Sequence, residues 1–349
     1  MDILDWYIKN RPIYKRLTLK VESLLSEVFE MQNISYHIIS SRTKDIDSVN
    51  GKISKGKYDK PHEQIQDFSG IRIITYVEDE IEQICKIIEK IFNIDEDNSS
   101  NKSDDLGIDK VGYKSVHYIA YLDDSRLKLP EYEQYKGKCF EIQVRTILQH
   151  AWAEIEHDRN YKYTGKLPSD IGRRFKILAG VLEMADREFN NISNEIDLIS
   201  DNTVKGTKKG ELDIPISSTT ITKYFETRFS KLIKNGYPII QNTDEEIFIE
   251  IEKFGLKTLA DLDKLISKKL EDSLNVYVKQ NSLNELGLIR RILIISDFNK
   301  YFSEIVNERE EPWFWSISEH YDLEYNFFKQ CGIDWNIIEE KYNAFLSEE

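Results

Sequence analysis

Polar and apolar side chains alternate in the stretch FEIQVR, a pattern that predicts a β-strand with two different faces. Glu141, Gln143 and Arg145 share one face, and the other face is apolar. An acid, an amide and a guanidinium in a row suit a metal ion and phosphate groups, although an ordinary half-exposed strand shows the same alternation. In the helix predicted to follow, His150 and Glu154 lie one turn apart and continue the polar face.

A basic cluster precedes this strand in the chain. Arg42, Lys44, Lys52 and Lys55, with Ser48 among them, place four cations and a hydroxyl within 14 residues. Such cations could converge on a polyphosphate, with Arg also able to stack on a base. A solvated basic face is the alternative, and the cluster alone does not decide between the two.

Two carboxylates on separate predicted strands are candidates for a Mg²⁺ site. Asp67 comes directly before a strand that carries Arg72, and Glu141 lies on the polar-faced strand. Mg²⁺ prefers a few hard oxygens and leaves room for substrate phosphates, which two carboxylates supply. An Asp at the start of an element is also common for purely structural reasons.

The segment GYKSVH predicts a third polar strand face, made by Tyr113, Ser115 and His117. An aromatic ring at the start of a strand can stack on a purine base, although Tyr and His are also common in sheets. The pair His157–Asp158 lies in the predicted helix after the polar strand, without a second His/Asp set. We interpret it as a pair on the helix surface and expect no hydrolase activity from it.

Composition restricts the classes of protein. The chain has 349 residues, 40% hydrophobic and 32% charged, which is typical of a soluble globular protein of two domains. There is no run of 18 apolar residues and no apolar secretory core at the start, so we expect a cytoplasmic protein without a membrane span. Three scattered cysteines, Cys85, Cys139 and Cys331, argue against a disulfide framework. A net charge of −14 argues against general nucleic-acid binding.

Strands interleaved with helices predict an α/β (α+β) domain over residues 1–199, a mixed β-sheet flanked by helices. Its expected elements are a helix over 15–38, a strand over 67–77, a helix over 79–92, a polar loop over 93–110, and strands over 112–122 and 140–145. Residues 200–215 are predicted to be a linker, followed by a mostly α-helical accessory domain over 216–349. Its expected helices cover 221–233, 259–278, 283–305 and 334–346, and an aromatic-rich stretch covers 310–328.

Four motifs in this order resemble the synthetase domain of the RelA/SpoT-type alarmone synthetases. They are RTKDIDSVNGKISK, DFSGIR, GYKSVH, and EIQVRT with the following HAWAE, and the resemblance covers about residues 35–165. It implies a nucleotidyltransferase-like fold. It also implies a Mg²⁺-dependent transfer of the β,γ-diphosphate of ATP to the 3′-hydroxyl of GTP or GDP. The absence of a preceding hydrolase domain leads us to expect a one-way enzyme.

The resemblance also implies a role for each matching residue. The metal ligands and catalytic residues would be Asp67 and Glu141. ATP would be bound by Arg42, Lys44, Ser48, Lys52, Lys55 and Arg72, with Arg42 against adenine. The acceptor would be bound by Lys110, Tyr113, Ser115, His117, Gln143, Arg145, His150 and Glu154, with Tyr113 stacked on guanine. The chain departs from the family at two places: Gln83 stands about where many members carry an adenine-clamping arginine, and the lysine before GYKSVH is shifted to Lys110.

Two other functions remain open from the sequence. Some relatives are toxins that place the diphosphate on the tRNA 3′ end or on adenine nucleotides, and the accessory domain would then be a neutraliser or the sensor of a trigger. The net charge of −14 counts against tRNA. A nucleotide-sensing module without transfer is the third reading, although Asp67 and Glu141 would have little purpose in it. The sequence also leaves open a homo-oligomer and a protein partner of the accessory domain.

Overall fold

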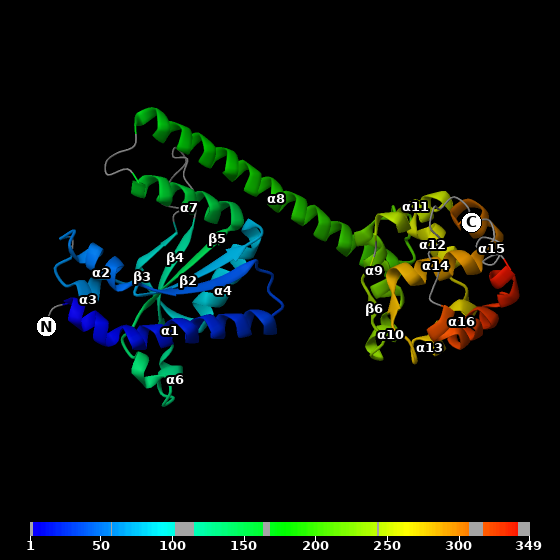
Figure 1. Ribbon diagram of the computed structural model, residues 1–349, viewed down its shortest axis with the longest axis horizontal. Coiled ribbons are helices and arrows are strands. Elements are labelled where there is room, and N and C mark those ends of the chain that lie inside the picture. Colours follow the sequence, from blue (N-terminus) through cyan, green and yellow to red (C-terminus); the bar gives the residue numbers. More distant parts are fainter. Residues whose placement is uncertain are drawn as a thin grey trace. The chain divides into compact units, whose positions relative to one another are not determined.

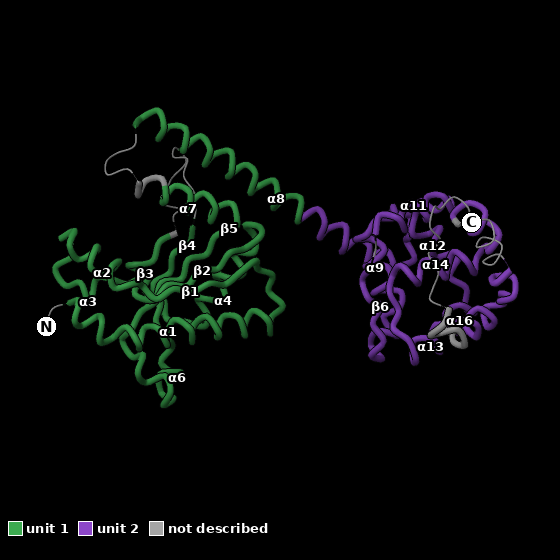
Figure 2. The backbone as a smooth tube through the Cα atoms, viewed as in Figure 1, with its two compact units in different colours: residues 1–193 green, residues 194–349 purple. Residues whose placement is uncertain are grey.

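The computed structural model describes residues 3–56, 58–101, 115–162, 168–242, 244–306 and 317–340. The chain divides into two compact units, Met1–Ser193 and Asn194–Glu349 (Figure 2). One helix, α8 (Ser169–Lys209), contributes residues to both units. Residues 200–209, predicted as part of an irregular linker, are therefore helical. The small and polar residues of this stretch hid the helix, because they lack an apolar period.

The first unit contains a five-stranded mixed sheet in the order β1-β2-β5-β4-β3 (Figure 1). The strands are β1 (Ile38–Thr43), β2 (Ser69–Thr75), β3 (Phe92–Asn101), β4 (Val116–Leu122) and β5 (Phe140–Thr146). Only the central pair β2–β5 is parallel, and the other three pairs are antiparallel. The sheet confirms the predicted fold class.

One face of this sheet carries the core. Ile71, Ile73, Ile142 and Val144 are fully buried in one cluster with side chains of α1 (Ile3–Met31) and α4 (Glu78–Ile91). On the other face, α7 (Ile147–Lys162) packs against β2 and β5 (Figure 1). The alternation seen in the sequence thus separates a buried apolar face from a polar face. The remaining elements of this unit are short: α2 (Ile46–Ile53), α3 (Pro61–Gln64), α6 (Asp124–Leu127) and a 3₁₀ turn (Glu133–Tyr135).

Two expectations for this unit were wrong, and one further segment contains elements that the sequence did not indicate. The predicted polar loop over 93–110 begins as β3, which continues to Asn101, and residues 102–110 lie outside the described part. β3 is an edge strand whose ladder bonds come from β4, so its sequence needs no buried alternation. β1 and α2 occupy the segment predicted only as basic, and α1 spans Ile3–Met31 rather than 15–38.

The second unit is mostly helical, as predicted, and has its own core. Its helices are α9 (Ser218–Arg228), α10 (Ser230–Lys234), α11 (Glu245–Lys253), α12 (Leu259–Leu265), α13 (Lys268–Tyr277), α14 (Glu285–Ser296), α15 (Phe298–Tyr301) and α16 (Ile317–Cys331), with a π-helical turn at Phe302–Val306. Two short strands, β6 (Ile239–Ile240) and β7 (Leu283–Asn284), pair in parallel.

Three helices predicted as continuous are broken in this unit. The helix expected over 259–278 ends at Leu265 and restarts after Ser267, whose hydroxyl accepts from the Leu270 N–H as an N-cap. Asp297 likewise caps α15 and interrupts the helix expected over 283–305. The helix expected over 221–233 is divided at Phe229. Apolar spacing that continued across these caps concealed the breaks.

The two remaining predictions for this unit reach beyond the described residues. Residues 335–340 are helical, and 341–346 lie outside the described part, as do residues 310–316 of the aromatic-rich stretch. Within the ranges that the structure describes, no helix combines the length and apolarity needed to cross a membrane.

Candidate active site

A cavity of about 510 Å³ opens on the polar face of the sheet. It is lined by Ser40, Ser41, Arg42, Lys44, Lys52, Asp67, Gly70, Ile71, Arg72, Glu141, Gln143 and His157. The strand register explains the convergence: Arg42 lies opposite Gly70 across β1–β2, and Gly70 lies beside Glu141 across β2–β5. Seven of the predicted site residues, from three strands and their flanking segments, therefore meet at one cavity.

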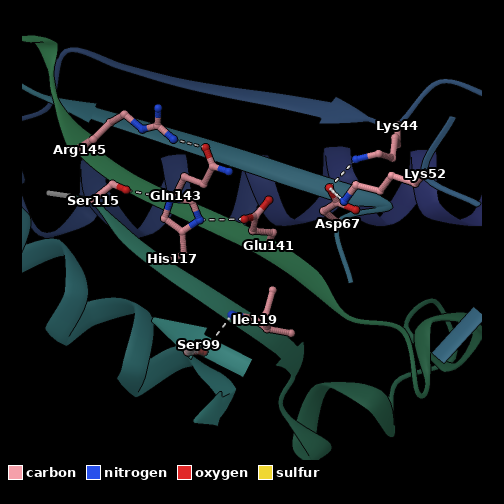
Figure 3. A network of polar contacts seen from close by, with 10 residues as sticks. All are labelled: Lys44, Lys52, Asp67, Ser99, Ser115, His117, Ile119, Glu141, Gln143 and Arg145. Atoms are coloured by element: carbon pink, nitrogen blue, oxygen red, sulfur yellow. Dashed lines mark hydrogen bonds and ion pairs between the residues drawn. The ribbon is translucent and has the colours of Figure 1, made fainter. Parts of the chain in front are cut away.

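Asp67 is held by two lysines at the end of this cavity (Figure 3). Lys44 Nζ and Lys52 Nζ both donate to Asp67 Oδ2, the second at 2.7 Å, and Lys44 is only 7% exposed. The other oxygen, Oδ1, is buried without a hydrogen-bond partner. Burial would raise the pKa of the Asp67 carboxyl, but the two lysines outweigh it and lower the pKa. The carboxylate is thus charged at neutral pH, with one oxygen open to a further cation.

Glu141 is the second carboxylate, and it belongs to a chain of hydrogen bonds between β5 and β4 (Figure 3). Its Oε1 lies 3.0 Å from His117 Nδ1, and His117 Nε2 lies 2.9 Å from Ser115 Oγ. Burial would raise the pKa of Glu141, but His117 and Gln143 outweigh it and lower the pKa. Glu141 is therefore an ionised acceptor whose orientation is set by an imidazole.

A third group of polar side chains joins the sheet to α7. Arg72 Nη1 lies 2.9 Å from Glu154 Oε1, and His150 Nδ1 lies 4.0 Å from the same oxygen. Arg145 is buried and donates to Gln143 Oε1. Burial lowers the pKa of His150, an effect that the two arginines reinforce and Glu154 opposes. His150 is accordingly neutral at pH 7, and the predicted polar continuity from strand to helix is present.

A second cavity, of about 910 Å³, lies between α4, β3 and β4. It contains Ser115 and His117 of the predicted acceptor residues, together with four glutamates: Glu78, Glu82, Glu89 and Glu96. The smaller cavity holds the lysine-bound carboxylate and the cations, so we take it, rather than the larger one, as the candidate active site.

Some predicted site residues are not brought to either cavity. Ser48 lies exposed on α2 and Lys55 lies exposed beyond its end, so the basic cluster divides into cavity and surface parts. Lys110 and Tyr113 lie outside the described residues. His157 and Asp158 are both exposed, which agrees with their interpretation as a surface pair, and His157 also lines the smaller cavity. The helical spacing of His157 from Glu154 and His150 was the signal for it, since the three fall on one side of α7.

A protein-family profile described as "Region found in RelA / SpoT proteins" matches residues 41–166. Residues 41–166 are therefore similar to a region that RelA/SpoT proteins share. This region contains every residue that lines the smaller cavity, apart from Ser40, and the motifs that carried the resemblance.

Two curated relatives extend beyond the RelA/SpoT region. GTP pyrophosphokinase YjbM of Bacillus subtilis (strain 168) is 27% identical over 203 residues, which is 56% of this chain and 92% of that protein. GTP pyrophosphokinase YwaC of the same strain is 28% identical over 171 residues, 45% of this chain and 73% of that protein. The crystal structure of small alarmone synthetase 1 from Bacillus subtilis matches 55% of this chain and 98% of its own, with 23% identity and a TM-score of 0.47.

The RelA/SpoT region offers donors that fit Mg²⁺. Asp67 Oδ1 is buried and lacks a partner, and Glu141 lines the same cavity, so two hard anionic oxygens are available. In the described ranges, no group of three or more His, Cys, Asp or Glu could enclose a metal without help. Substrate phosphates and water would have to complete the shell, which is how Mg²⁺ is commonly bound beside nucleotides.

The lowered pKa of Glu141 predicts a pH dependence of stability. A carboxyl whose pKa is lower in the folded than in the unfolded state stabilises the fold above the unfolded pKa, near 4.3, and this contribution is lost as the pH falls through the folded pKa. We therefore expect the free energy of unfolding to fall below about pH 5, and to fall less steeply in Glu141→Gln. Denaturant titrations between about pH 7 and about pH 3 measure both slopes. The exposed Asp47→Asn is the control, and equal slopes for Glu141→Gln and the native chain would contradict the assignment.

Proposed function

We propose that the chain is an ATP:GTP/GDP 3′-diphosphotransferase, which makes a guanosine alarmone with Mg²⁺. The observation that carries this proposal is the lysine-bound Asp67, with one buried free oxygen, in the same cavity as Glu141 and the arginines of β1 and β2. The two curated relatives, both called GTP pyrophosphokinases, support the assignment.

The cations of the cavity have a direct use in this reaction. Lys44 and Lys52 neutralise Asp67 before substrate binds, and the triphosphate of ATP offers them stronger acceptors. Arg72, held at the cavity by Glu154, adds a guanidinium against the charge that develops on the transferred group. Arg42 is exposed at the cavity wall, where a guanidinium can stack on adenine. Mg²⁺, when bound, neutralises phosphate charge beside Asp67 and Glu141.

Glu141 would receive the proton of the acceptor. The 3′-oxygen forms a bond to the β-phosphorus of ATP, the bond from that phosphorus to the α–β bridging oxygen breaks, and AMP leaves with that oxygen. The hydroxyl proton passes to Glu141, which is ionised at neutral pH and oriented by His117. No covalent intermediate is needed, so positioning and charge stabilisation suffice.

The acceptor is identified by a direct product assay. Purified protein, Mg²⁺ and γ-labelled ATP are incubated separately with GDP, GTP, ATP and tRNA, and the labelled product is analysed. We expect 3′-diphosphorylated guanosine nucleotides, with GDP and GTP used at least tenfold better than ATP or tRNA. Label on tRNA or on an adenine nucleotide would replace the proposal with the toxin-type reaction. No labelled product with any acceptor would reject diphosphate transfer altogether.

A further inference from the structure

A buried carboxylate with a free oxygen lies in the second unit, far in sequence from the RelA/SpoT region. Glu285 is 2% exposed, and its Oε2 is buried without a hydrogen-bond partner. It lines a cavity of about 540 Å³ together with Ser218, Thr219, Thr222, Lys223, Gln241 and Asn242. An unsatisfied buried carboxylate is costly, so its presence at a cavity needs a reason.

Local structure holds Glu285 in this place. Asn284 ends β7 and caps α14, so Glu285 is the first residue of that helix. β7 pairs with β6, and this pairing brings Gln241 and Asn242, which follow β6, to the same cavity. Burial raises the pKa of Glu285. Hydrogen bonds from the Thr222 hydroxyl and the Asn242 backbone N–H oppose this rise. The carboxyl is therefore fixed on one side only.

The neighbouring wall of the cavity has the opposite electrostatic character. Ser218 and Thr219 form the first turn of α9, where backbone N–H groups lack intrahelical acceptors and the helix dipole is positive. Lys223 lies one turn further along the same helix and also lines the cavity, and its ammonium is 2.8 Å from Glu226 Oε2. Hydroxyl groups, N–H groups and an ammonium together favour an anionic group at this wall.

These two walls select the class of ligand. A lone cation would meet Lys223 and the positive end of α9, and a lone anion would meet Glu285. Thr222 touches Glu285 and lies one helical turn, about 5.4 Å, beyond Ser218, so the two subsites are close together. A nucleotide, whose base and phosphates are separated by a ribose, is too long to bridge them. A molecule with an ammonium and a carboxylate attached to the same carbon has the required span.

We propose that this cavity binds a free α-amino acid, with its carboxylate at the first turn of α9 and its ammonium at Glu285. Gln241 and Asn242, both exposed at the mouth, would contact the amino-acid side chain. The second unit is then a ligand-binding module, which is independent of whether the first unit transfers diphosphate.

Thermal shift and calorimetry on the full chain test the proposal. The probes are the twenty α-amino acids, with acetate, methylamine and glycerol as carboxylate-only, amine-only and neutral controls. We expect at least one amino acid to raise the melting temperature of the second unit and none of the three controls to do so. Failure of all twenty at 10 mM, or an equal shift by a control, would overturn the proposal.

Two variants connect the binding to the cavity. Glu285→Gln keeps the shape of the side chain and removes its charge, and Lys223→Met removes the ammonium at the other wall. Each should weaken amino-acid binding at least tenfold, while Glu252→Gln, an exposed glutamate on α11 outside the cavity, should not. Relief of a buried charge should leave unliganded Glu285→Gln at least as stable as the native chain. Unchanged binding in both cavity variants would place the ligand elsewhere and reject this site.

Discussion

Replacement of Asp67 by asparagine is expected to lower the rate of diphosphate transfer by about 10³-fold, which corresponds to about 4 kcal/mol of transition-state stabilisation. The substitution removes the charge that fixes Lys44 and Lys52 and one of the two carboxylates offered to Mg²⁺. Initial rates with ATP and GDP over a range of Mg²⁺ concentrations measure the effect. Because Asp67 is one of the two proposed Mg²⁺ ligands, the residual activity should also require more Mg²⁺ for half saturation.

The same substitution at a nearby exposed aspartate shows whether the loss of activity is specific to Asp67. Asp45→Asn changes a nearby aspartate whose side chain is 67% exposed and lies 3.5 Å from Arg11, so its activity should stay within about twofold. Denaturation of both variants shows whether Asp67→Asn still folds, since it leaves the buried Lys44 with a neutral acceptor. A folded Asp67→Asn protein with native activity and native Mg²⁺ dependence would show that Asp67 is structural.

The motifs of the first unit predicted seven of the residues that line the smaller cavity, because each motif combines a local pattern with a chemical type. Strand alternation placed Glu141 and Gln143 on the polar face, and the register of β2 and β5 then brought them beside Gly70 and Arg72. This pairing is a long-range property that residue spacing cannot supply. From the sequence, only the order of the motifs suggested that these residues lie together. The pairing of β2 with β5 is the physical reason that they do.

Other features were hidden for identifiable reasons. The segment IISSRT carries too few apolar residues to indicate a strand, although β1 forms one edge of the cavity. His157 was not assigned to the site because only the fold brings α7 against β2 and β5, beside the cavity. Glu285 stands in the sequence NELGL as an ordinary helix start, and its burial depends on the pairing of β6 with β7. Sequence patterns predict which face is polar, whereas the enclosure of a polar group comes from tertiary contacts.

A charged residue within an apolar run is different, because the sequence itself then indicates that the charged side chain is buried. Arg290 stands in the run LGLIRRILIIS of α14 and is only 5% exposed. Its guanidinium donates to both oxygens of Glu250 on α11, with Nε–Oε1 at 3.0 Å and Nη2–Oε1 at 2.6 Å. Tyr301 donates to the same carboxylate at 3.2 Å. A buried arginine in an apolar helix needs a buried acid as its partner, and another element must supply that acid.

Removal of that acid is expected to destabilise the second unit strongly. Glu250→Ala should lower its free energy of unfolding by ~3–5 kcal/mol, because the guanidinium of Arg290 loses its bidentate partner inside the core. Glu246, 3.9 Å away but 64% exposed, can replace only part of this contact. Hydrogen exchange of the α14 amides, measured on the full chain in increasing denaturant, isolates this unit from the unfolding of the first.

The double variant Glu250→Leu/Arg290→Met distinguishes the loss of a partner from the loss of stabilisation. Replacing a whole buried ion pair by apolar residues of similar size is often neutral or stabilising, so the double variant should recover most of the stability lost in Glu250→Ala. Glu226→Ala removes an acid from an ion pair whose side chains are 36% and 44% exposed, and should change the stability by less than ~1 kcal/mol. If Glu250→Ala were as mild as Glu226→Ala, water would have to reach Arg290 in the variant. If the double variant were as unstable as Glu250→Ala, the pair itself would be a net source of stability in this core.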